Sequence, residues 1–244
     1  VSLLHSLSIM NFSMTNILLT LLPFCISFIA VTLIHPYLVR FAKAKNIVDN
    51  PNARKIQKVP TPLLGGIAAF FGVITALTTA GLFCEEPSLY VVMGILVIMV
   101  YIGTLDDIIS LSPFVRFSFE TLVILLLIYC NQYSLNDFHG LWGIGMLPDY
   151  IAVPLTVFVC VGIINAINLI DGVNGLCSGF CIMASMVFGG VFIWGNETEA
   201  ASLAVLSVGA LIPFFLHNVF GRKSKMFIGD GGTLLMGCVM SVFV

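Results

Sequence analysis

The chain has 244 residues, of which 59% are hydrophobic and only 9% are charged, and its formal net charge is −2. Charged residues make up about a quarter of an ordinary soluble domain, so this composition excludes a water-soluble fold of the usual kind. We therefore expect an all-α polytopic integral membrane protein that sits in a lipid bilayer and has no nucleic-acid partner.

Apolar runs long enough to cross a bilayer recur along the chain. Since each crossing takes roughly 20 apolar residues, about eight transmembrane helices are expected. The expected spans are Ile17–Val39, Leu63–Phe83, Leu89–Leu105, Phe114–Cys130, Tyr150–Ile164, Leu176–Trp194, Ala200–Leu216 and a last one from Thr233 to Val244. This last span would rise only about 18 Å as a helix. Residues 1–244 are thus expected to form a single transmembrane domain that is incomplete at its C-terminus.

Basic residues are confined to one side of these spans, where all lie in loops except Arg116, which is in the first turn of the span Phe114–Cys130. They are Arg40, Lys43, Lys45, Arg54, Lys55, Lys58, Arg116, Arg222, Lys223 and Lys225. The opposite loops, around Glu85 and across Asn131–Asp149 and Gly195–Glu199, contain no Lys or Arg. Because cytoplasmic loops of membrane proteins carry an excess of basic residues, the basic side is expected to face the cytoplasm.

The loop after the first span combines an acid, several prolines and basic side chains. It begins at Asp49, contains Arg54 and Lys55, and closes with Gly65-Gly66 at the start of the second span. Pro and Gly fix an irregular loop that lets the backbone approach a ligand closely. The basic side chains suit a polyanionic ligand, or alternatively the headgroups of the lipids.

Two adjacent carboxylates, Asp106 and Asp107, follow the apolar run Leu89–Leu105. At the C-terminal end of a helix they would meet the negative end of the helix dipole. Neighbouring carboxylates also raise each other's pKa unless a cation holds them ionised, and Mg²⁺ takes oxygen ligands of this kind. The alternative is an interfacial pair that only faces water.

A polar stripe follows in the middle of the chain. Asn165, Asn168 and Asp171 recur every three residues, which on a helix places them within an arc of about 120°. An Asp inside a membrane helix costs about 2.5–3.5 kcal/mol, so such residues usually face a partner or a wet cavity. Interhelical hydrogen bonding is one interpretation. Gly172 and Gly175, which should break the helix, favour a site instead.

The last polar cluster runs from His217 to Thr233 and opens the last helix. Gly-rich backbone at a helix N-terminus presents free N–H groups, which form a binding site for phosphate. The carboxylate of Asp230 at that binding site would repel phosphate unless a metal ion bridged the two, so Asp230 is a candidate metal ligand. The alternative is an ordinary Asp helix cap.

These clusters together match a known pattern of motifs. The matching residues are Asp49, Pro51 and Arg54-Lys55 with Pro60-Thr61-Pro62 and Gly65-Gly66; Leu105-Asp106-Asp107; Asn165-Ala166, Asn168, Asp171-Gly172 and Gly175-Leu176; and Phe227, Gly229-Asp230 and Gly232. In order and spacing they resemble the polyprenyl-phosphate N-acetylhexosamine-1-phosphate transferases, glycosyltransferase family 4. The resemblance implies transfer of a HexNAc-1-phosphate from a UDP-N-acetylhexosamine to polyprenyl (undecaprenyl) phosphate, with release of UMP. It places the active site on the cytoplasmic face of a bacterial inner membrane.

The resemblance also implies catalytic and metal-binding roles. Asp106 would deprotonate or orient the lipid phosphate. We favour direct attack by that phosphate, and the alternative is that Asp106 acts as a covalent nucleophile. Asp107 would help to hold Mg²⁺, or Mn²⁺ in its place. Asp230 would be the second metal ligand, and Asp171 corresponds to an essential acid of the middle motif.

Further residues are implied in substrate binding. They are Asp49, Arg54, Lys55, Asn165, Asn168, Asn218 and Phe227. Phe227 would stack on uracil and Asn218 would contact the uridine, while Arg116 is a further candidate for neutralising phosphate charge. Dimers occur in the family, so the resemblance leaves a homodimer open, although this sequence does not show one.

The chain departs from the family pattern at several positions. Gln57 stands where His is common, Asn174 where a second Asp is common, and Thr233 where Ser is common. The family's histidine-rich loop would lie beyond Val244, so residues 1–244 alone are expected to have little or no activity.

Other functions stay open at this stage. The segment Gly221–Lys225 resembles the branch that uses UDP-GlcNAc for cell-surface polysaccharides. The phospho-MurNAc-pentapeptide transferases of peptidoglycan synthesis rank second. An ion-coupled secondary transporter would use Asp106, Asp107 and Asp171 as its ion site, but such sites lie near the midplane between repeats, and no repeat is visible. A structural membrane scaffold would leave the acidic motifs without a purpose.

Overall fold

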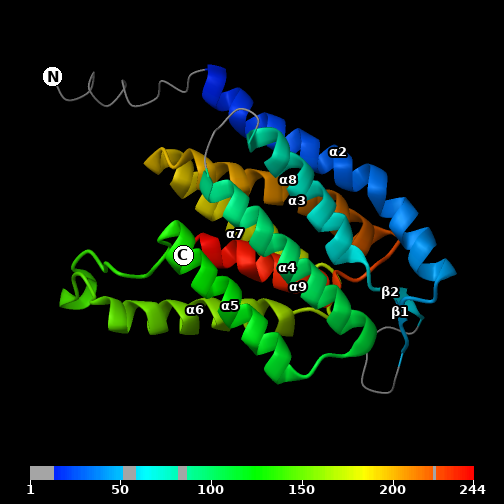
Figure 1. Cartoon of the computed structure of the whole chain (residues 1–244). Coiled ribbons are helices and arrows are strands. Elements are labelled where there is room, and N and C mark those ends of the chain that lie inside the picture. Colours follow the sequence, from blue (N-terminus) through cyan, green and yellow to red (C-terminus); the bar gives the residue numbers. More distant parts are fainter. Residues whose placement is uncertain (1–13, 52–58, 82–86, 222–223) are drawn as a thin grey trace.

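The computed structural model describes residues 14–51, 59–81, 87–221 and 224–244, and most of these residues are helical (Figure 1). The helices are α2 (Met14–Ala44), α3 (Gly65–Gly81), α4 (Pro87–Ile109), α5 (Pro113–Asn131), α6 (Asp149–Leu169), α7 (Leu176–Gly195), α8 (Thr198–Phe220) and α9 (Gly229–Val242). Two short strands, β1 (Val48–Asp49) and β2 (Thr61–Pro62), and a 3₁₀ turn, η2 (Leu141–Gly143), complete the described elements.

Each of the eight expected spans corresponds to one helix, which confirms the all-α polytopic prediction. Six of these helices are long and apolar enough to cross a membrane, while α3 has 17 residues and α9 has 14. The bounds of the helices differ from the predicted ones at several ends. The last helix begins at Gly229 rather than Thr233, and α4 continues past Leu105 to Ile109. Asp106 and Asp107 therefore lie in the last turns of α4.

The short helix α9 lies at the centre of the bundle. It packs against α4, α6, α3 and α7, and Figure 1 shows it enclosed among the other helices. Every residue from Gly231 to Met240 is buried. Small residues allow this enclosure, since a Cβ atom on Gly237 would come within 2.7 Å of the backbone of Ile164 in α6. Asp230, in the first turn of α9, is thereby brought into the interior of the helical bundle.

The helices α2, α3, α7 and α8 form the rest of the packing. α2 lies along α8 and α3, and α8 also packs against α7. Figure 1 shows α2 at the outer edge of the molecule. The buried side chains of Phe214, Leu206 and Leu211 in α8 fill the space between these helices. This layer supports α3, whose first residues meet the start of α9.

A small hairpin closes one end of the bundle. β1 and β2 pair antiparallel, with Asp49 opposite Thr61. The Phe227 backbone N–H donates to the carbonyl of Pro62 at 2.8 Å, and the Phe227 carbonyl accepts from the N–H of Gly65 at 3.0 Å. The hairpin, the start of α3 and the segment before α9 therefore form one hydrogen-bonded unit.

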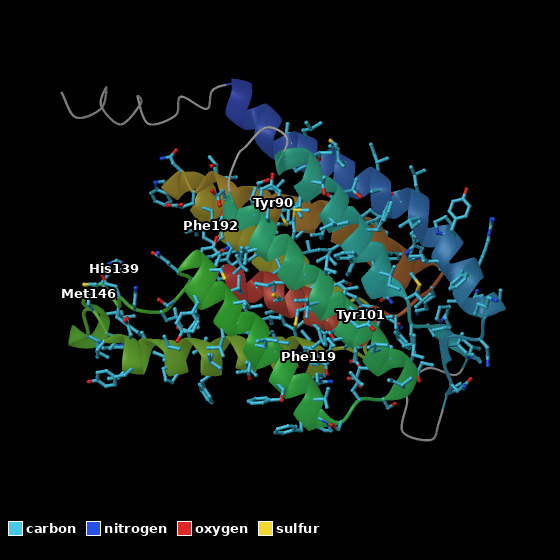
Figure 2. All side chains as sticks on the ribbon, in the orientation of Figure 1. Tyr90, Tyr101, Phe119, His139, Met146 and Phe192 are labelled. Carbon is cyan, nitrogen blue, oxygen red and sulfur yellow. The ribbon has the colours of Figure 1, made fainter. Side chains whose placement is uncertain are left out.

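The two ends of the bundle differ in charge. The described basic residues lie in or next to the connections at the hairpin end: Arg40, Lys43, Lys45, Arg116 and Lys225. The connection between α5 and α6, which carries His139 and Met146, extends at the opposite end of the molecule, away from Tyr101 and Phe119 (Figure 2). The chain is thus a multi-pass membrane protein with its polar motifs gathered at the basic end.

Candidate active site

Asp107 joins the end of α4 to the start of α9. Its Oδ1 accepts a hydrogen bond from the backbone N–H of Asp230 at 3.0 Å, and its Oδ2 accepts one from Gly231 at 3.2 Å. A carboxylate at a helix N-terminus satisfies unpaired N–H groups and complements the helix dipole. Two of the N–H groups that were predicted to bind phosphate at this terminus are therefore occupied by the carboxylate of Asp107.

Glycines make this close approach of α4 and α9 possible. Gly229 has a φ of +71°, and a Cβ atom there would lie 2.6 Å from both Oδ2 of Asp107 and the backbone oxygen of Leu63. A Cβ atom on Gly103 would lie 2.4 Å from the backbone oxygen of Asp230. Backbone atoms cannot move aside as a flexible side chain can, so these positions require glycine in this arrangement.

Asp106 points to a different set of partners from its neighbour. Its Oδ1 accepts from the backbone N–H of Leu111 at 2.7 Å, just beyond α4. Its Oδ2 forms a salt bridge with Arg116 at 3.2 Å, and the Asp106 side chain is only 10% exposed. Arg116 thus supplies part of the positive charge that was expected beside the two adjacent acids.

Arg116 connects α4, α5 and α6. Its terminal nitrogens contact Asp106, the Oδ1 atom of Asn165 at 3.2 Å and the Oδ1 atom of Asn168 at 3.3 Å. Its Nε lies 3.3 Å from Oε1 of Glu120, one turn further along α5. The guanidinium group therefore links residues that are far apart in the sequence.

Asn168 completes the connection to α9. Its Nδ2 donates to Oδ1 of Asp230 at 2.5 Å and to the hydroxyl of Thr233 at 2.8 Å. Asn165 lies one turn earlier on α6 and donates to Oε2 of Glu120. The polar stripe predicted on this helix is confirmed for these two residues. Both face polar partners on neighbouring helices.

The stripe does not extend to Asp171. α6 ends at Leu169, and the chain turns there, with the N–H of Asp171 donating to the carbonyl of Asn168 at 3.2 Å. The Asp171 carboxylate accepts from the backbone N–H groups of Gly172 and Gly229, so it still lies next to the start of α9. Burial raises the pKa of this carboxyl, although these two hydrogen bonds partly lower it.

Phe227 and Asn218 lie beside Asp171 and line a narrow pocket with it. Phe227 is 7% exposed, so most of its ring is covered by protein. Asn218 is buried, and both ends of its amide are used: Oδ1 accepts from the N–H of Gly175 at 2.7 Å and Nδ2 donates to the carbonyl of Met226 at 2.7 Å. In this structure Asn218 ties the loop after α6 to the segment before α9.

The hairpin residues among the predicted sites are placed only in part. Asp49 lies in β1, half-buried and paired in register with Thr61. Arg54 and Lys55 lie outside the described residues. Since β2 leads directly into the unit formed with Phe227, the described end of this loop lies close to the acids at the start of α9.

The acids have the chemistry that a divalent cation requires. Among the described residues, no three His, Cys, Asp or Glu side chains form a group that could hold a metal ion alone. Mg²⁺, however, is usually bound by one or two carboxylates together with water and substrate phosphates. Asp107 and Asp230 lie next to each other, and each Asp107 oxygen accepts one N–H bond and keeps a second lone pair. The pair fits a metal site that substrate completes.

Glu120 is a member of this network that sequence reasoning missed. Its side chain is 1% exposed, in a helix that is otherwise apolar enough to span a membrane. The spacing of four residues between Arg116 and Glu120 was the available signal, because residues so spaced are neighbours on a helix. An acid within the apolar run Phe114–Cys130 could have been singled out on that basis.

A larger cavity lies at the opposite end of the bundle. It is lined by residues such as Tyr133, Thr156, Glu197 and Phe243 and contains none of the predicted site residues. We place the candidate active site at the hairpin end in spite of this cavity, because the acids, the asparagines and the arginine converge there.

Comparison with known proteins finds relatives of this chain. A family model described as glycosyl transferase family 4 matches residues 88–244, more than half of the chain. The chain is 30% identical over 224 residues to a "Probable undecaprenyl-phosphate N-acetylglucosaminyl 1-phosphate transferase" of Bacillus subtilis, covering 90% of this chain and 60% of the relative.

Two further relatives carry the name "Undecaprenyl-phosphate alpha-N-acetylglucosaminyl 1-phosphate transferase". One, from Escherichia coli O157:H7, is 30% identical over 86% of this chain and 58% of its own length. Another, from Yersinia pestis, is 31% identical over 78% of this chain and 53% of its own length. The chain therefore spans between about half and three fifths of the curated relatives that it matches.

Proposed function

The chain belongs to glycosyl transferase family 4, and from this premise we propose that it transfers GlcNAc-1-phosphate from UDP-GlcNAc to undecaprenyl phosphate. The reaction releases UMP and leaves a lipid-linked pyrophosphate. The names of the relatives support this choice of sugar and of lipid acceptor. Because the chain spans only part of those relatives, the activity is proposed for the full natural protein.

One observation carries the proposal: acids from separate motifs meet around a single guanidinium group. Arg116 contacts Asp106, and Asn168 joins Arg116 to Asp230. Asp107 in turn holds the backbone at Asp230. To catalyse phosphoryl transfer, a protein mainly has to position the reacting groups and neutralise the charge of the phosphates. This arrangement supports both.

The reaction that we propose is a direct displacement. An oxygen of the lipid phosphate attacks the phosphorus atom that carries the sugar, and the bond from that phosphorus to the UMP oxygen breaks. Asp106 would orient the lipid phosphate or take its proton, and Arg116 would neutralise charge on the phosphates. Mg²⁺ or Mn²⁺, when held by Asp107 and Asp230, would neutralise the pyrophosphate and assist departure of UMP.

The donor would bind between the loop after α6 and the segment before α9. Phe227 would supply the surface for uracil, and Asp171 lies in the same pocket. Opening of that pocket is required, because Phe227 is largely covered. Asn165 and Asn168 would act through their contacts with Arg116, while Asp49, Arg54 and Lys55 would bind substrate from the hairpin loop.

The charge distribution supports a cytoplasmic position for the site. The described basic residues gather at the hairpin end, which the positive-inside rule places in the cytoplasm. There the water-soluble nucleotide sugar would meet the phosphate headgroup of the lipid at the membrane surface. The protein would then act in the plasma membrane of a bacterium, at the first membrane step of a cell-surface polysaccharide.

UMP release tests the proposal. Membranes containing the full natural protein are supplied with UDP-GlcNAc and undecaprenyl phosphate, with and without Mg²⁺. Release that needs both the lipid and the metal, and that is lost in Asp106→Asn and Asp230→Asn, is the expected result. Release with UDP-MurNAc-pentapeptide in place of UDP-GlcNAc would contradict the proposed donor, and no release with either donor would contradict the transferase.

A further inference from the structure

Glu120 is a fully buried acid in a membrane-spanning helix. Its side chain is 1% exposed and lies in the second turn of α5. Burial of an unpaired carboxylate in such a helix is costly, so acids at these positions are usually paired and functional. The contacts of Glu120 show what it is paired with.

Both oxygens of Glu120 are directed at the candidate active site. Oε1 lies 3.3 Å from Nε of Arg116, and Oε2 accepts a hydrogen bond from Nδ2 of Asn165. Asn165 also contacts Arg116 through its own Oδ1 at 3.2 Å. Glu120 therefore faces the guanidinium group as an ion-pair partner through Oε1, which has no hydrogen-bond partner among the described residues. Through Oε2 it hydrogen-bonds the amide that lies against that group.

The guanidinium group is held at each of its nitrogens. Glu120 faces Nε, Asn165 and Asn168 share one terminal nitrogen, and Asp106 faces the other. An arginine side chain has several rotatable bonds, so it needs more than one partner to stay in a single orientation. Glu120 and Asp106 thus approach different nitrogens of the group, Nε and a terminal nitrogen.

We propose that Glu120 is a positioning residue that fixes Arg116 through its Nε edge, so that the terminal nitrogens face the position where phosphate is transferred. This inference rests on the proposed function. When substrate phosphate replaces Asp106 as a partner of Arg116, the contact with Glu120 keeps the guanidinium group in place. Glu120 itself touches no substrate and acts through Arg116.

Glu120→Gln is the appropriate substitution. Glutamine has the same shape and retains a carbonyl oxygen that can accept from Asn165, but it removes the negative charge opposite Arg116. Arg116→Lys is the matching change on the partner, because it keeps the positive charge and loses the guanidinium geometry. Ser118→Ala is the control on the same helix, since its exposed hydroxyl donates to the carbonyl of Phe114 one turn earlier.

The test is a double-mutant cycle on kcat and KM in the full natural protein, with thermal unfolding of each variant. We expect Glu120→Gln to lower kcat by about tenfold with little change in KM for UDP-GlcNAc, because phosphates are bound but misaligned. In the Arg116→Lys background, Glu120→Gln should lower kcat by less than about twofold further, because residues that act as a unit are not additive.

Three outcomes would overturn the inference. The first is a wild-type kcat in Glu120→Gln, equal to that of Ser118→Ala. The second is a full multiplication of the two single effects in the double variant. The third is a loss of activity that follows a fall in melting temperature, with an unchanged kcat in the folded fraction. If the wild-type protein released no UMP, the proposed function itself would fail, which is a separate result.

Discussion

Asp107, in the last turns of α4, accepts hydrogen bonds from the backbone N–H groups of Asp230 and Gly231 at 3.0 and 3.2 Å. One proposed metal ligand thus fixes the backbone of the other. The side chain of Asp230 is held in addition by Asn168. The distance between the two carboxylates therefore depends on the packing of α4, α6 and α9, and their geometry is set before any ligand arrives.

Asp107→Ala should destabilise the protein even without metal or substrate. The substitution leaves two N–H groups at the start of α9 without their acceptor, and loss of a helix cap typically costs about 0.5–2 kcal/mol. Thermal unfolding in detergent with a chelator measures this. Asp149→Ala, at the exposed start of α6, is the control and should have a smaller effect. An unchanged melting temperature for Asp107→Ala would show that the cap does not stabilise the fold.

Gly229→Ala should lower both stability and activity. Alanine would have to adopt a φ of +71°, and its Cβ would approach Oδ2 of Asp107 and the carbonyl of Leu63 at 2.6 Å. A strained backbone of this kind costs on the order of 1–3 kcal/mol. Gly94→Ala in α4 is the matched control, because a Cβ there meets no other atom within 4 Å. Equal melting temperatures for the two variants would contradict this packing.

Asn218→Ala should act first on stability. The variant leaves the N–H of Gly175 and the carbonyl of Met226 without partners, and each such buried group costs about 1–3 kcal/mol. Asn174→Ala, exposed in the neighbouring loop, should leave the melting temperature almost unchanged. A rise in KM for the UDP-sugar at an unchanged melting temperature would instead favour a direct uridine contact at Asn218.

Asp171 should make stability depend on pH in a definite direction. Burial raises its pKa above the usual 3.8, so the folded chain binds the proton more tightly than the unfolded chain does. This contribution favours folding at low pH and is lost as pH rises through the folded pKa. The melting temperature of the wild type minus that of Asp171→Asn should therefore fall as pH rises above about 4. A difference that stays constant or rises would contradict the raised pKa.

The helices could be predicted from the sequence, since each apolar run near 20 residues long needs a helix to satisfy its backbone in a membrane. The sequence also predicted that the polar motifs meet at one end of the molecule, because spans that alternate in direction bring every second loop to the same side. Asn165 and Asn168 could be placed on one face from their spacing alone. These inferences need only local periodicity and the thickness of a bilayer.

Other features depend on contacts between distant segments. Nothing near Asp107 in the sequence indicates that its carboxylate caps a helix more than a hundred residues away. The end of α6 was predicted at the glycines after Asp171, but a tight turn closes the helix at Leu169. The burial of Phe227 similarly arises from packing against β2 and α3. Such partners follow from the tertiary arrangement, which local patterns do not encode.

Transfer of the sugar-linked phosphate is the central claim, and an isotope label tests it most directly. UDP-GlcNAc labelled in the phosphate next to the sugar is incubated with the full natural protein, undecaprenyl phosphate and Mg²⁺, and the lipid is extracted. Sugar-1-phosphate transfer predicts that the label moves into the lipid while unlabelled UMP is released. Label that stays in the aqueous phase as UDP, while the sugar alone enters the lipid, would contradict the account.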